Sequence, residues 1–299
     1  MKLVRAVLLA AVAAFATPAA AQELEPRAYA PNPTRANFVV VVYGHSSGDV
    51  VFDPSVPATD VTASVNSGSL LYGRTFGLLG RSASAGVGLP YVWGTIEGNV
   101  GEQRKSVYRS GLGDLRLRLA VNLVGGPALG PREFAQRRPR PSLGASLLVV
   151  APTGQYDPAK RINIGTHRWA FKPELGFSRP LGRWFVEVYG GAWLFTDNDD
   201  FFGGSLREQE PIGTFQAHAS YTFRPRLWLA ADTTFYAGGR TTVNGVEKAD
   251  LQRNSRYGLT LAVPLKQRSS LKLAWARGLT TRIGGDFTTL AVGYQFLWF

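Results

Sequence analysis

The final strand-like segment is the feature of this sequence that most constrains its fold. Residues 287–299, FTTLAVGYQFLWF, alternate in character and finish on the aromatic Phe299. A soluble domain rarely leaves an apolar strand unprotected, because the free edge promotes aggregation. The last strand of an outer-membrane barrel instead pairs with the first strand, so that no edge remains. The segment therefore predicts a closed β-barrel, with this strand as both its closing element and the signal for the barrel-assembly machinery.

The opposite end of the sequence has the features of a secretory signal peptide. Lys2 and Arg5 precede a short apolar run, Pro18 interrupts that run, and residues 19–21 are small, as a cleavage site requires. We expect cleavage after Ala21. An N-terminal membrane anchor is the alternative, although the run is shorter than the ~20 residues that span a bilayer. The chain has no cysteine, which excludes disulfides and a lipid anchor on cysteine.

Composition limits the class of the mature chain. Removal of residues 1–21 leaves 299 − 21 = 278 residues, enough for one large β domain. No later stretch has the ~20 continuous apolar residues of a membrane helix. The formal charge is +12, and loss of Lys2 and Arg5 gives 12 − 2 = +10. The basic residues are scattered, which argues against nucleic acid and favours outer-membrane lipid and lipopolysaccharide headgroups, or a lumen that tolerates anions.

A polar, Pro-rich arm at residues 22–35 precedes the strands, and we expect it in the periplasm or inside the lumen. Residues 36–299 then predict an all-β, transmembrane antiparallel barrel of about twelve strands. The strand-like segments are 36–46, 64–78, 82–96, 109–124, 142–152, 167–179, 183–196, 212–224, 226–238, 254–265, 270–280 and 286–299.

Several of these segments alternate with the period of a strand. In residues 114–123 the leucines and Val121 share one face, whereas Asp114, Arg116 and Arg118 share the other. The first, second and fifth segments alternate poorly, and no inward face is assigned to them.

The connections between the segments also follow a pattern. Tight connections alternate with longer polar ones, as in barrels with short periplasmic turns and long outer loops. An even strand count then places both termini in the periplasm. The connection at 125–141 departs from this pattern, because it is long and basic although the strand count places it in the periplasm. It is either a solvated loop or a contact for lipid headgroups or a partner.

Several local motifs resemble one family of outer-membrane barrels. The motifs are LEPRAY (24–29), YGRTF (72–76), GLGDLRLR (111–118), APTGQYDP (151–158), residues 163–184, SYTFRPRLWLAAD (220–232), YAGGRTT (236–242) and residues 271–287. Together they cover nearly the whole mature chain, which resembles the barrels named for the meta-pathway of phenol degradation, often described as transporters. The resemblance implies passage of a small-molecule solute, aromatic or otherwise hydrophobic. It implies no catalytic residues and no cofactor.

The last strand departs from the usual assembly signal. In the usual signal, every second residue counted back from the terminal phenylalanine is apolar. Here that set of alternate residues includes Gln295 and Gly293, and the other set of alternate residues is more apolar. We therefore place Tyr294, Phe296 and Trp298 toward lipid and treat Phe299 as an overhang of one residue. These four residues form the predicted assembly signal.

The inward frames predict which side chains line the lumen. A charge facing lipid costs about 2 to 4 kcal/mol near the midplane, so the charged residues of the strands must point inward. The lumen is either filled by paired charges or crossed by a water-filled path that these charges line. Arg277 breaks the pattern, because it shares a frame with Leu273 and Trp275, and it either snorkels or marks a bulge. The predicted lumen residues are Asp114, Arg116, Arg118, Lys172, Glu174, Glu187, His218, Arg224, Asp232, Arg256 and Lys272.

Two further motifs bear on chemistry. His218 and Ser220 share the lumen face, as in a barrel lipase, but residues two apart on a strand do not orient each other like a catalytic triad. Residues 197–200, DNDD, could offer oxygen ligands to calcium on an outer loop or form a solvated loop that binds nothing. No metal or cofactor motif is present. The sequence predicts a passive outer-membrane channel for small molecules and not an enzyme; the alternative is a non-transporting structural or adhesion barrel that acts through its outer loops.

Overall fold

A computed structural model describes residues 25–52, 58–266 and 268–299. The signal peptide expected at residues 1–21 lies outside the described residues. Twelve barrel positions are filled in chain order, and neighbours along the chain pair antiparallel. The barrel strands are β1 (Asn37–Val51), β2 (Ala58–Leu78), β3 (Arg81–Val100), β4 (Gln103–Leu112) followed by β5 (Leu115–Val124), β6 (Ser142–Ala151), β7 (Ala170–Leu181), β8 (Trp184–Phe195), β11 (Ile212–Arg224), β12 (Leu227–Gly238), β15 (Gln252–Lys266), β16 (Ser269–Thr280) and β17 (Gly284–Trp298).

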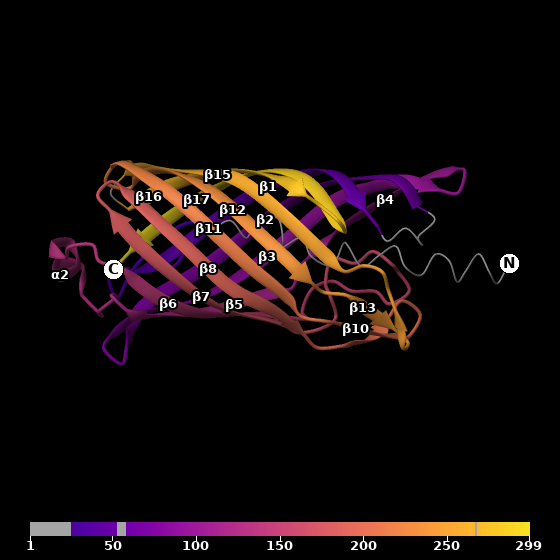
Figure 1. The fold of residues 1–299 in the computed structure, drawn as a ribbon, viewed down its shortest axis with the longest axis horizontal. Helices are drawn as coiled ribbons and strands as arrows, with labels where there is room; N and C mark the ends of the chain where they lie inside the picture. Colours follow the sequence, from indigo (N-terminus) through magenta and orange to yellow (C-terminus); the bar gives the residue numbers. More distant parts are fainter. Residues whose placement is uncertain (1–24, 53–57, 267) are drawn as a thin grey trace.

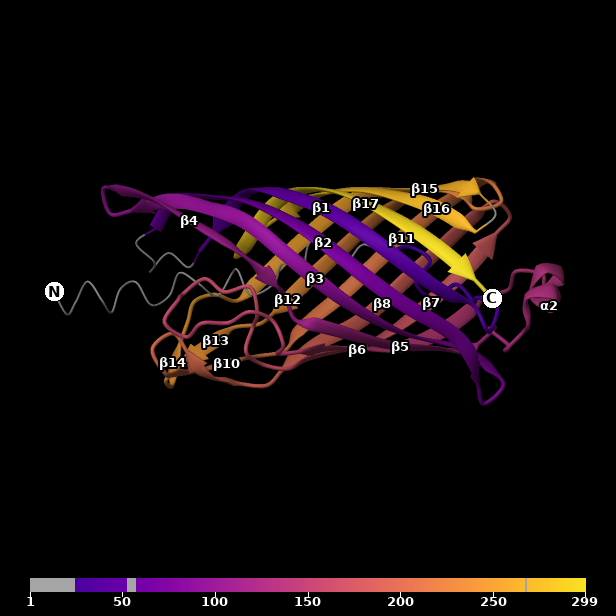
Figure 2. The same ribbon diagram turned by 180° about the vertical axis from the view of Figure 1, so that it is seen from behind.

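The barrel is closed by its first and last strands. β1 pairs with β17 over the whole of both strands, from Asn37 opposite Trp298 to Val51 opposite Gly284. β1 pairs on its other side with β2, which continues the ring to β3. Figures 1 and 2 show the tilted strands forming one cylinder, with the C-terminus and the helix α2 (Pro131–Gln136) at the same end. The prediction of a closed, twelve-stranded antiparallel barrel is confirmed.

The wall has its apolar side chains outside and its polar side chains inside. On β7, Leu175 and Phe177 are exposed, whereas Glu174 and Ser178 are buried. On β11 and β12, Phe215 and Phe235 are likewise exposed on the outer surface. A water-soluble sheet would expose the opposite face. The arrangement is that of a transmembrane barrel, whose lipid-facing and lumen-facing residues alternate. Among the residues that the structure describes, no helix is long and apolar enough to span a membrane.

The fourth barrel strand is interrupted, although the sequence predicts one continuous strand at 109–124. β4 pairs with the second half of β3, from Tyr91 to Val100, whereas β5 pairs with the first half, from Ala83 to Gly88. Between them the backbone amide of Gly113 donates to the carbonyl of Pro90 (2.8 Å). Pro90 has no N–H with which to continue the ladder on β3. A side chain on Gly113 would come within 2.9 Å of the Pro90 ring, so the crossing requires glycine. The break leaves Asp114 between two strands.

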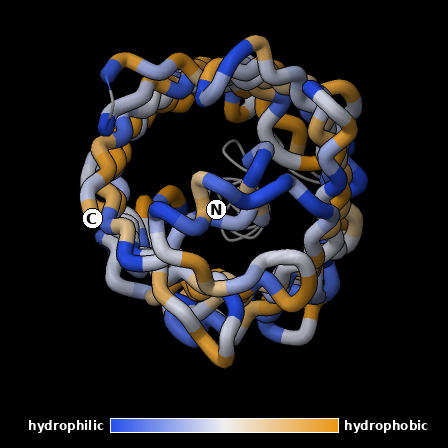
Figure 3. The backbone as a smooth tube through the Cα atoms, turned by 90° about the vertical axis from the view of Figure 1, so that its left-hand side faces the viewer, coloured by the Kyte–Doolittle hydropathy of each residue, from blue (hydrophilic) through white to orange (hydrophobic). Residues whose placement is uncertain are grey.

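The connections define two ends of the barrel. We call the end with the tight turns and Phe299 the turn end; it also holds α2, inside the long connection at 125–141. The opposite, loop end carries a second sheet of four short strands, which the sequence did not predict. They pair in the order β14-β13-β10-β9, with bounds β9 (Asn198–Phe201), β10 (Ser205–Gln209), β13 (Thr241–Val243) and β14 (Val246–Glu247). Figure 3 shows the barrel wall in end view as a ring with chain segments inside it.

Candidate functional site

The described part of the N-terminal arm, residues 25–35, lies inside the turn half of the lumen and is anchored by Arg27. The backbone amide of Arg27 donates to Oε2 of Glu187 (2.6 Å), and its guanidinium donates to the hydroxyls of Ser220 (3.0 Å) and Thr222 (2.7 Å). The same guanidinium stacks 4.6 Å from the ring centroid of Trp228. Burial lowers the pKa of Arg27, and the Glu187 carboxylate opposes that shift. One arm residue therefore bridges three strands of the wall.

Tyr29 is the second anchor of the arm. It is 2% exposed, and its hydroxyl donates to Oε1 of Glu174 (2.8 Å) and lies 2.7 Å from the hydroxyl of Ser146. Burial and the neighbouring Glu174 carboxylate raise its pKa well above the ordinary value, so that the hydroxyl keeps its proton. The ring lies against two wall glycines, Gly144 and Gly176, which face each other across β6 and β7. Only glycine leaves room for the ring there.

The wall charges of the turn half form a connected polar cluster with the arm. Nζ of Lys172 lies 2.8 Å from Glu174, which also accepts from Gln216 (3.0 Å). Glu187 is 1% exposed and accepts from the hydroxyls of Ser178 and Tyr189 as well as from the arm. These contacts satisfy both carboxylates inside the barrel.

A second pair lies beside this cluster. Nδ1 of His218 lies 2.7 Å from Asp232, and the other oxygen of Asp232 accepts from Thr260 (2.7 Å). Ser220, the residue weighed with His218 as a hydrolase pair, instead accepts a hydrogen bond from Arg27 and donates to the carbonyl of Phe185 (3.4 Å). The contacts of Ser220 are those of an anchor for the arm.

The other predicted lumen residues lie in four different places. Arg118 is half-buried, with its guanidinium 5.5 Å from the Tyr29 ring centroid. Lys272 is exposed, although its ammonium lies 5.9 Å from the ring of the buried Trp228. Arg224 is exposed at a tight turn and does not join the cluster, because a bulge between Thr222 and Arg224 shifts the register. The remaining three, Asp114, Arg116 and Arg256, line a cavity at the loop half.

The terminal aromatic residues lie on the outer surface. Tyr294 and Phe296 are exposed on β17, and Trp298 stacks on Phe296 with ring centroids 5.8 Å apart. Phe299 follows the end of β17 and is 60% exposed. Arg277 is exposed on the same face of β16 as Leu273.

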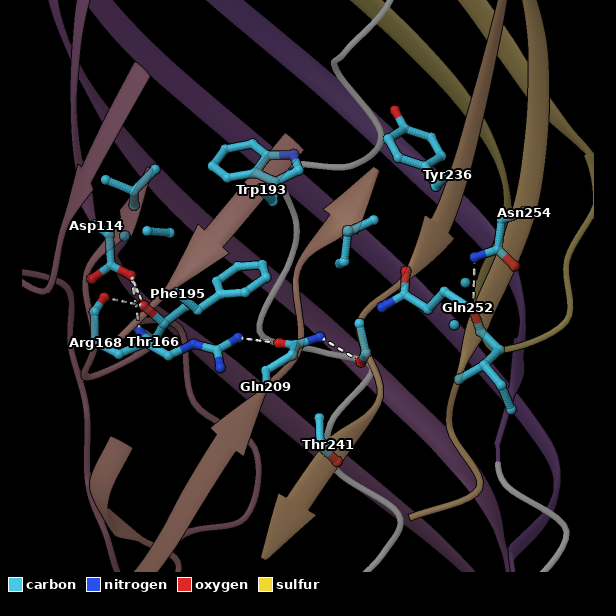
Figure 4. Close-up of a pocket in the computed structure, with 18 of the residues that line it drawn as sticks. Asp114, Thr166, Arg168, Trp193, Phe195, Gln209, Tyr236, Thr241, Gln252 and Asn254 are labelled. Carbon is cyan, nitrogen blue, oxygen red and sulfur yellow. Dashed lines mark hydrogen bonds between the residues drawn. The ribbon is translucent and has the colours of Figure 1, made fainter. Parts of the chain in front are cut away.

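The cavity of about 140 Å³ occupies the loop half of the lumen, between the barrel wall and the four-stranded sheet. One side is an apolar cluster inside the barrel, where Trp193 and Tyr236 lie near the top of Figure 4. Val150, Ala170 and Ile212 complete the buried part of this cluster. A cavity of about 150 Å³ with an apolar lining is large enough for benzene. The cavity therefore has the size of a single aromatic ring.

Asp114 seals one side of the cavity. Its Oδ1 accepts from the amide of Gly154 (2.8 Å), and its Oδ2 accepts from the amide (2.9 Å) and hydroxyl (2.7 Å) of Thr166. These bonds fold the connection at 152–169 onto the break between β4 and β5. The wall at this point is held by a side chain instead of a backbone ladder.

Two buried arginines face the cavity from the loop end. Arg168 precedes β7 and Arg207 lies on β10; each is 4% exposed. Nη2 of Arg168 donates to the side chain of Gln209, which in turn donates to the carbonyl of Gly239 (2.9 Å), as Figure 4 shows. Burial, assisted by the charge of Arg207, lowers the pKa of Arg168 to about 9. Burial lowers the pKa of Arg207 to about 10.

Sequence reasoning missed both arm anchors and both of these arginines. Arg27 and Tyr29 fall in a segment without strand periodicity, and Arg168 and Arg207 fall in connections. Trp193 could have been found, because it shares the inward frame of Glu187 on β8. Among the described residues, no group of three or more His, Cys, Asp or Glu side chains could hold a metal. Of residues 197–200, Asn198 begins β9, and its side-chain amide donates to the hydroxyl of Tyr156 (3.1 Å) and the carbonyl of Thr166 (3.1 Å).

The closed wall, apolar outer surface and polar lumen define a β-barrel of the outer-membrane class. Residues 32–296 match the model of the family described as "Putative MetA-pathway of phenol degradation". The chain belongs to this family, and the resemblance inferred from its motifs is confirmed.

Solved structures agree on the fold. An outer membrane channel from Pseudomonas putida F1 is 24% identical, with a TM-score of 0.76 over 92% of this chain and 100% of that chain. The β domain of the Bordetella autotransporter BrkA is 11% identical, with a TM-score of 0.51 over 88% of this chain and 99% of that one. No curated protein matches the chain.

Proposed function

We propose that this protein is a passive outer-membrane channel for small aromatic or other hydrophobic compounds. The observation that carries the proposal is the cavity of ring size, part apolar and part charged, inside a wall whose outer surface is apolar. The family and the channel from Pseudomonas putida F1 support the same function. The solute moves down its concentration gradient.

Several features of the chain follow from this proposal. The signal peptide directs export and is removed after Ala21. The barrel-assembly machinery reads the terminal strand, lipid and lipopolysaccharide surround the wall, and both termini face the periplasm. The loop end then faces outward and receives the solute first. The hydrogen bond from Arg27 to the hydroxyl of Ser220 supports a role of this serine in holding the arm and not in hydrolysis.

A structural or adhesion barrel is the second candidate, and one observation favours it. Arg27 and Tyr29 bind the arm across the turn half of the lumen and narrow any path through it. Reconstitution into planar bilayers and liposomes separates the two functions. A channel gives a steady single-channel current and admits small aromatic solutes, whereas a scaffold leaves the bilayer closed and the liposomes impermeable. A closed bilayer together with impermeable liposomes would overturn the channel proposal.

A further inference from the structure

The charges that line the cavity do not balance. Apart from Arg116, the described lining includes Arg168, Arg207 and Arg256 against Asp114 and Asp250, which gives 3 − 2 = +1. A buried charge is costly unless a partner compensates it. The two carboxylates compensate this charge only through space, Asp114 acting on Arg168 and Asp250 on Arg207, because their hydrogen bonds go to other donors. Asp114 accepts from Gly154 and Thr166, and Asp250 accepts from the amide (2.8 Å) and hydroxyl (2.6 Å) of Thr241.

Arg168 and Arg207 therefore keep guanidinium N–H groups that these carboxylates do not bind. Within the part of the chain that the structure describes, neither forms a salt bridge. Nη1 of Arg168 and Nε of Arg207 are buried without a hydrogen-bond acceptor, and so is Nε of Arg256. Gln209 takes only Nη2 of Arg168 and fixes that side chain in place. Guanidinium groups held in this way offer donors in the geometry that a carboxylate accepts.

The apolar side of the same cavity indicates which group the carboxylate should be attached to. Trp193 and Ile212 belong to a buried cluster at the cavity, and the ring of Phe195 packs against it and lies 4.4 Å from the Arg168 guanidinium. An inorganic anion would bury no apolar surface against this cluster, and a neutral aromatic compound would bring no charge to the arginines. A flat ring with one carboxylate satisfies both sides and fits the volume of about 140 Å³.

We propose that the cavity is a binding site for a monoaromatic carboxylate, whose ring lies against Trp193 and whose carboxylate accepts hydrogen bonds from Arg168 and Arg207. This inference rests on the proposed channel function and names the substrate class of its lumen. Arg256 contributes positive charge to the cavity from β15. The site then selects benzoate-like anions over neutral aromatic compounds such as benzamide or phenol.

Calorimetry on the purified barrel in detergent tests the site directly. Benzoate is titrated against benzamide, which has nearly the same shape without the charge. We expect saturable binding of benzoate, with benzamide at least about tenfold weaker, since charge-assisted hydrogen bonds are stronger than neutral ones. Arg168→Gln and Arg207→Gln should each weaken benzoate at least about tenfold. Arg138→Gln, which removes the same charge from an exposed position in the 125–141 connection, should leave the affinity unchanged.

Two results would overturn the inference: equal binding of benzoate and benzamide, or benzoate affinity unchanged in the folded arginine variants. Should those variants fail to fold, the preference of the unmodified protein for benzoate decides the matter alone. Liposome uptake keeps the two proposals apart. Uptake without benzoate preference removes the anion site and leaves the channel. If calorimetry finds saturable, arginine-dependent benzoate binding but the liposomes are impermeable, the anion site is retained and the channel function is rejected.

Discussion

The ring of Tyr29 rests against the backbone of Gly144, where a Cβ atom would lie 2.5 Å from Cδ1 of the tyrosine. The arm is thus seated in a depression made by a missing side chain, and Glu174 holds the hydroxyl from the neighbouring strand. The position of the arm is consequently encoded in the wall as much as in the arm itself.

Gly144→Val should therefore release the arm. The added side chain collides with Tyr29, and loss of its buried hydrogen bond to a charged group removes about 1.5 to 3 kcal/mol of arm binding. We expect a larger single-channel conductance and faster trypsin cleavage after Arg27. Gly190→Val is the matched control, because a Cβ at Gly190 meets no atom within 4 Å. Unchanged conductance and cleavage in a folded Gly144→Val barrel would show that Tyr29 does not secure the arm.

Leu117→Arg should impair insertion. Leu117 is 42% exposed on the outer face of β5, and a charge in that position costs about 2 to 4 kcal/mol near the midplane. Leu117→Met keeps the apolar surface and should insert normally. Heat-modifiable migration on unboiled gels measures the folded fraction. Equal folding of the two variants would contradict the assigned facing of β5.

Removal of residues 296–299 should prevent closure of the barrel. The truncation deletes the partners of Asn37, Phe38 and Val39 and leaves the start of β1 with a free edge. Removal of Phe299 alone takes nothing from the β1–β17 ladder, because β17 ends at Trp298. We expect that shorter truncation to refold in detergent but to assemble poorly in cells. Normal assembly of the longer truncation in cells would refute the closing role of this strand.

Arg116→Ser and Arg118→Ser should differ in effect, although the residues are two apart on one strand. Arg116 lines the cavity, so its loss should shift the reversal potential in a salt gradient toward cations. Arg118 lies beside Tyr29, so its loss should mainly loosen the arm and raise conductance. Identical effects on reversal potential would show that the two side chains line the same part of the path.

Benzoate binding should depend on pH in a defined direction. The carboxylate stays ionised above about pH 5, so its charge is constant over the range tested. Because Arg168 has a lowered pKa of about 9 and Arg207 one of about 10, their positive charge is present below pH 9 and is lost as pH rises through these values. Affinity should be flat from about pH 6 to 8 and fall above pH 9. Calorimetry across this range measures it; a fall that begins near pH 7 would implicate another group.

The strands were predictable because their facing is imposed by the lipid. Alternation at residues 114–123 or 171–178 leaves one solution in which charges avoid hydrocarbon, and the observed facing follows it. Local irregularities were not predictable in this way. The bulge at Thr222 moved Arg224 out of the lumen frame, and Pro90 broke the ladder opposite Gly113. The alternation of apolar and polar residues along a strand does not indicate where a bulge or a break in the ladder occurs.

The candidate site was harder to predict than the wall. Arg207 reaches the cavity because β10 pairs with β13. In this pairing Arg207 lies opposite Val243, so the contact joins two connections that are more than thirty residues apart in the sequence. Arg27 and Tyr29 belong to a turn in the arm, and contacts with the wall hold that turn in place. Such positions are fixed by tertiary contacts, and a single sequence without periodicity does not reveal them.

The pairing of β10 with β13 also limits how the loop end can vary. The two connections that it joins share one backbone ladder, so a change of length in either would displace the other and move Arg207 away from the cavity. The hairpin tips at Gly203–Gly204 and Asn244–Gly245 lie outside that ladder and are free of this restriction. An epitope tag or a foreign peptide inserted at either tip would be displayed on the surface while the cavity beneath kept its shape.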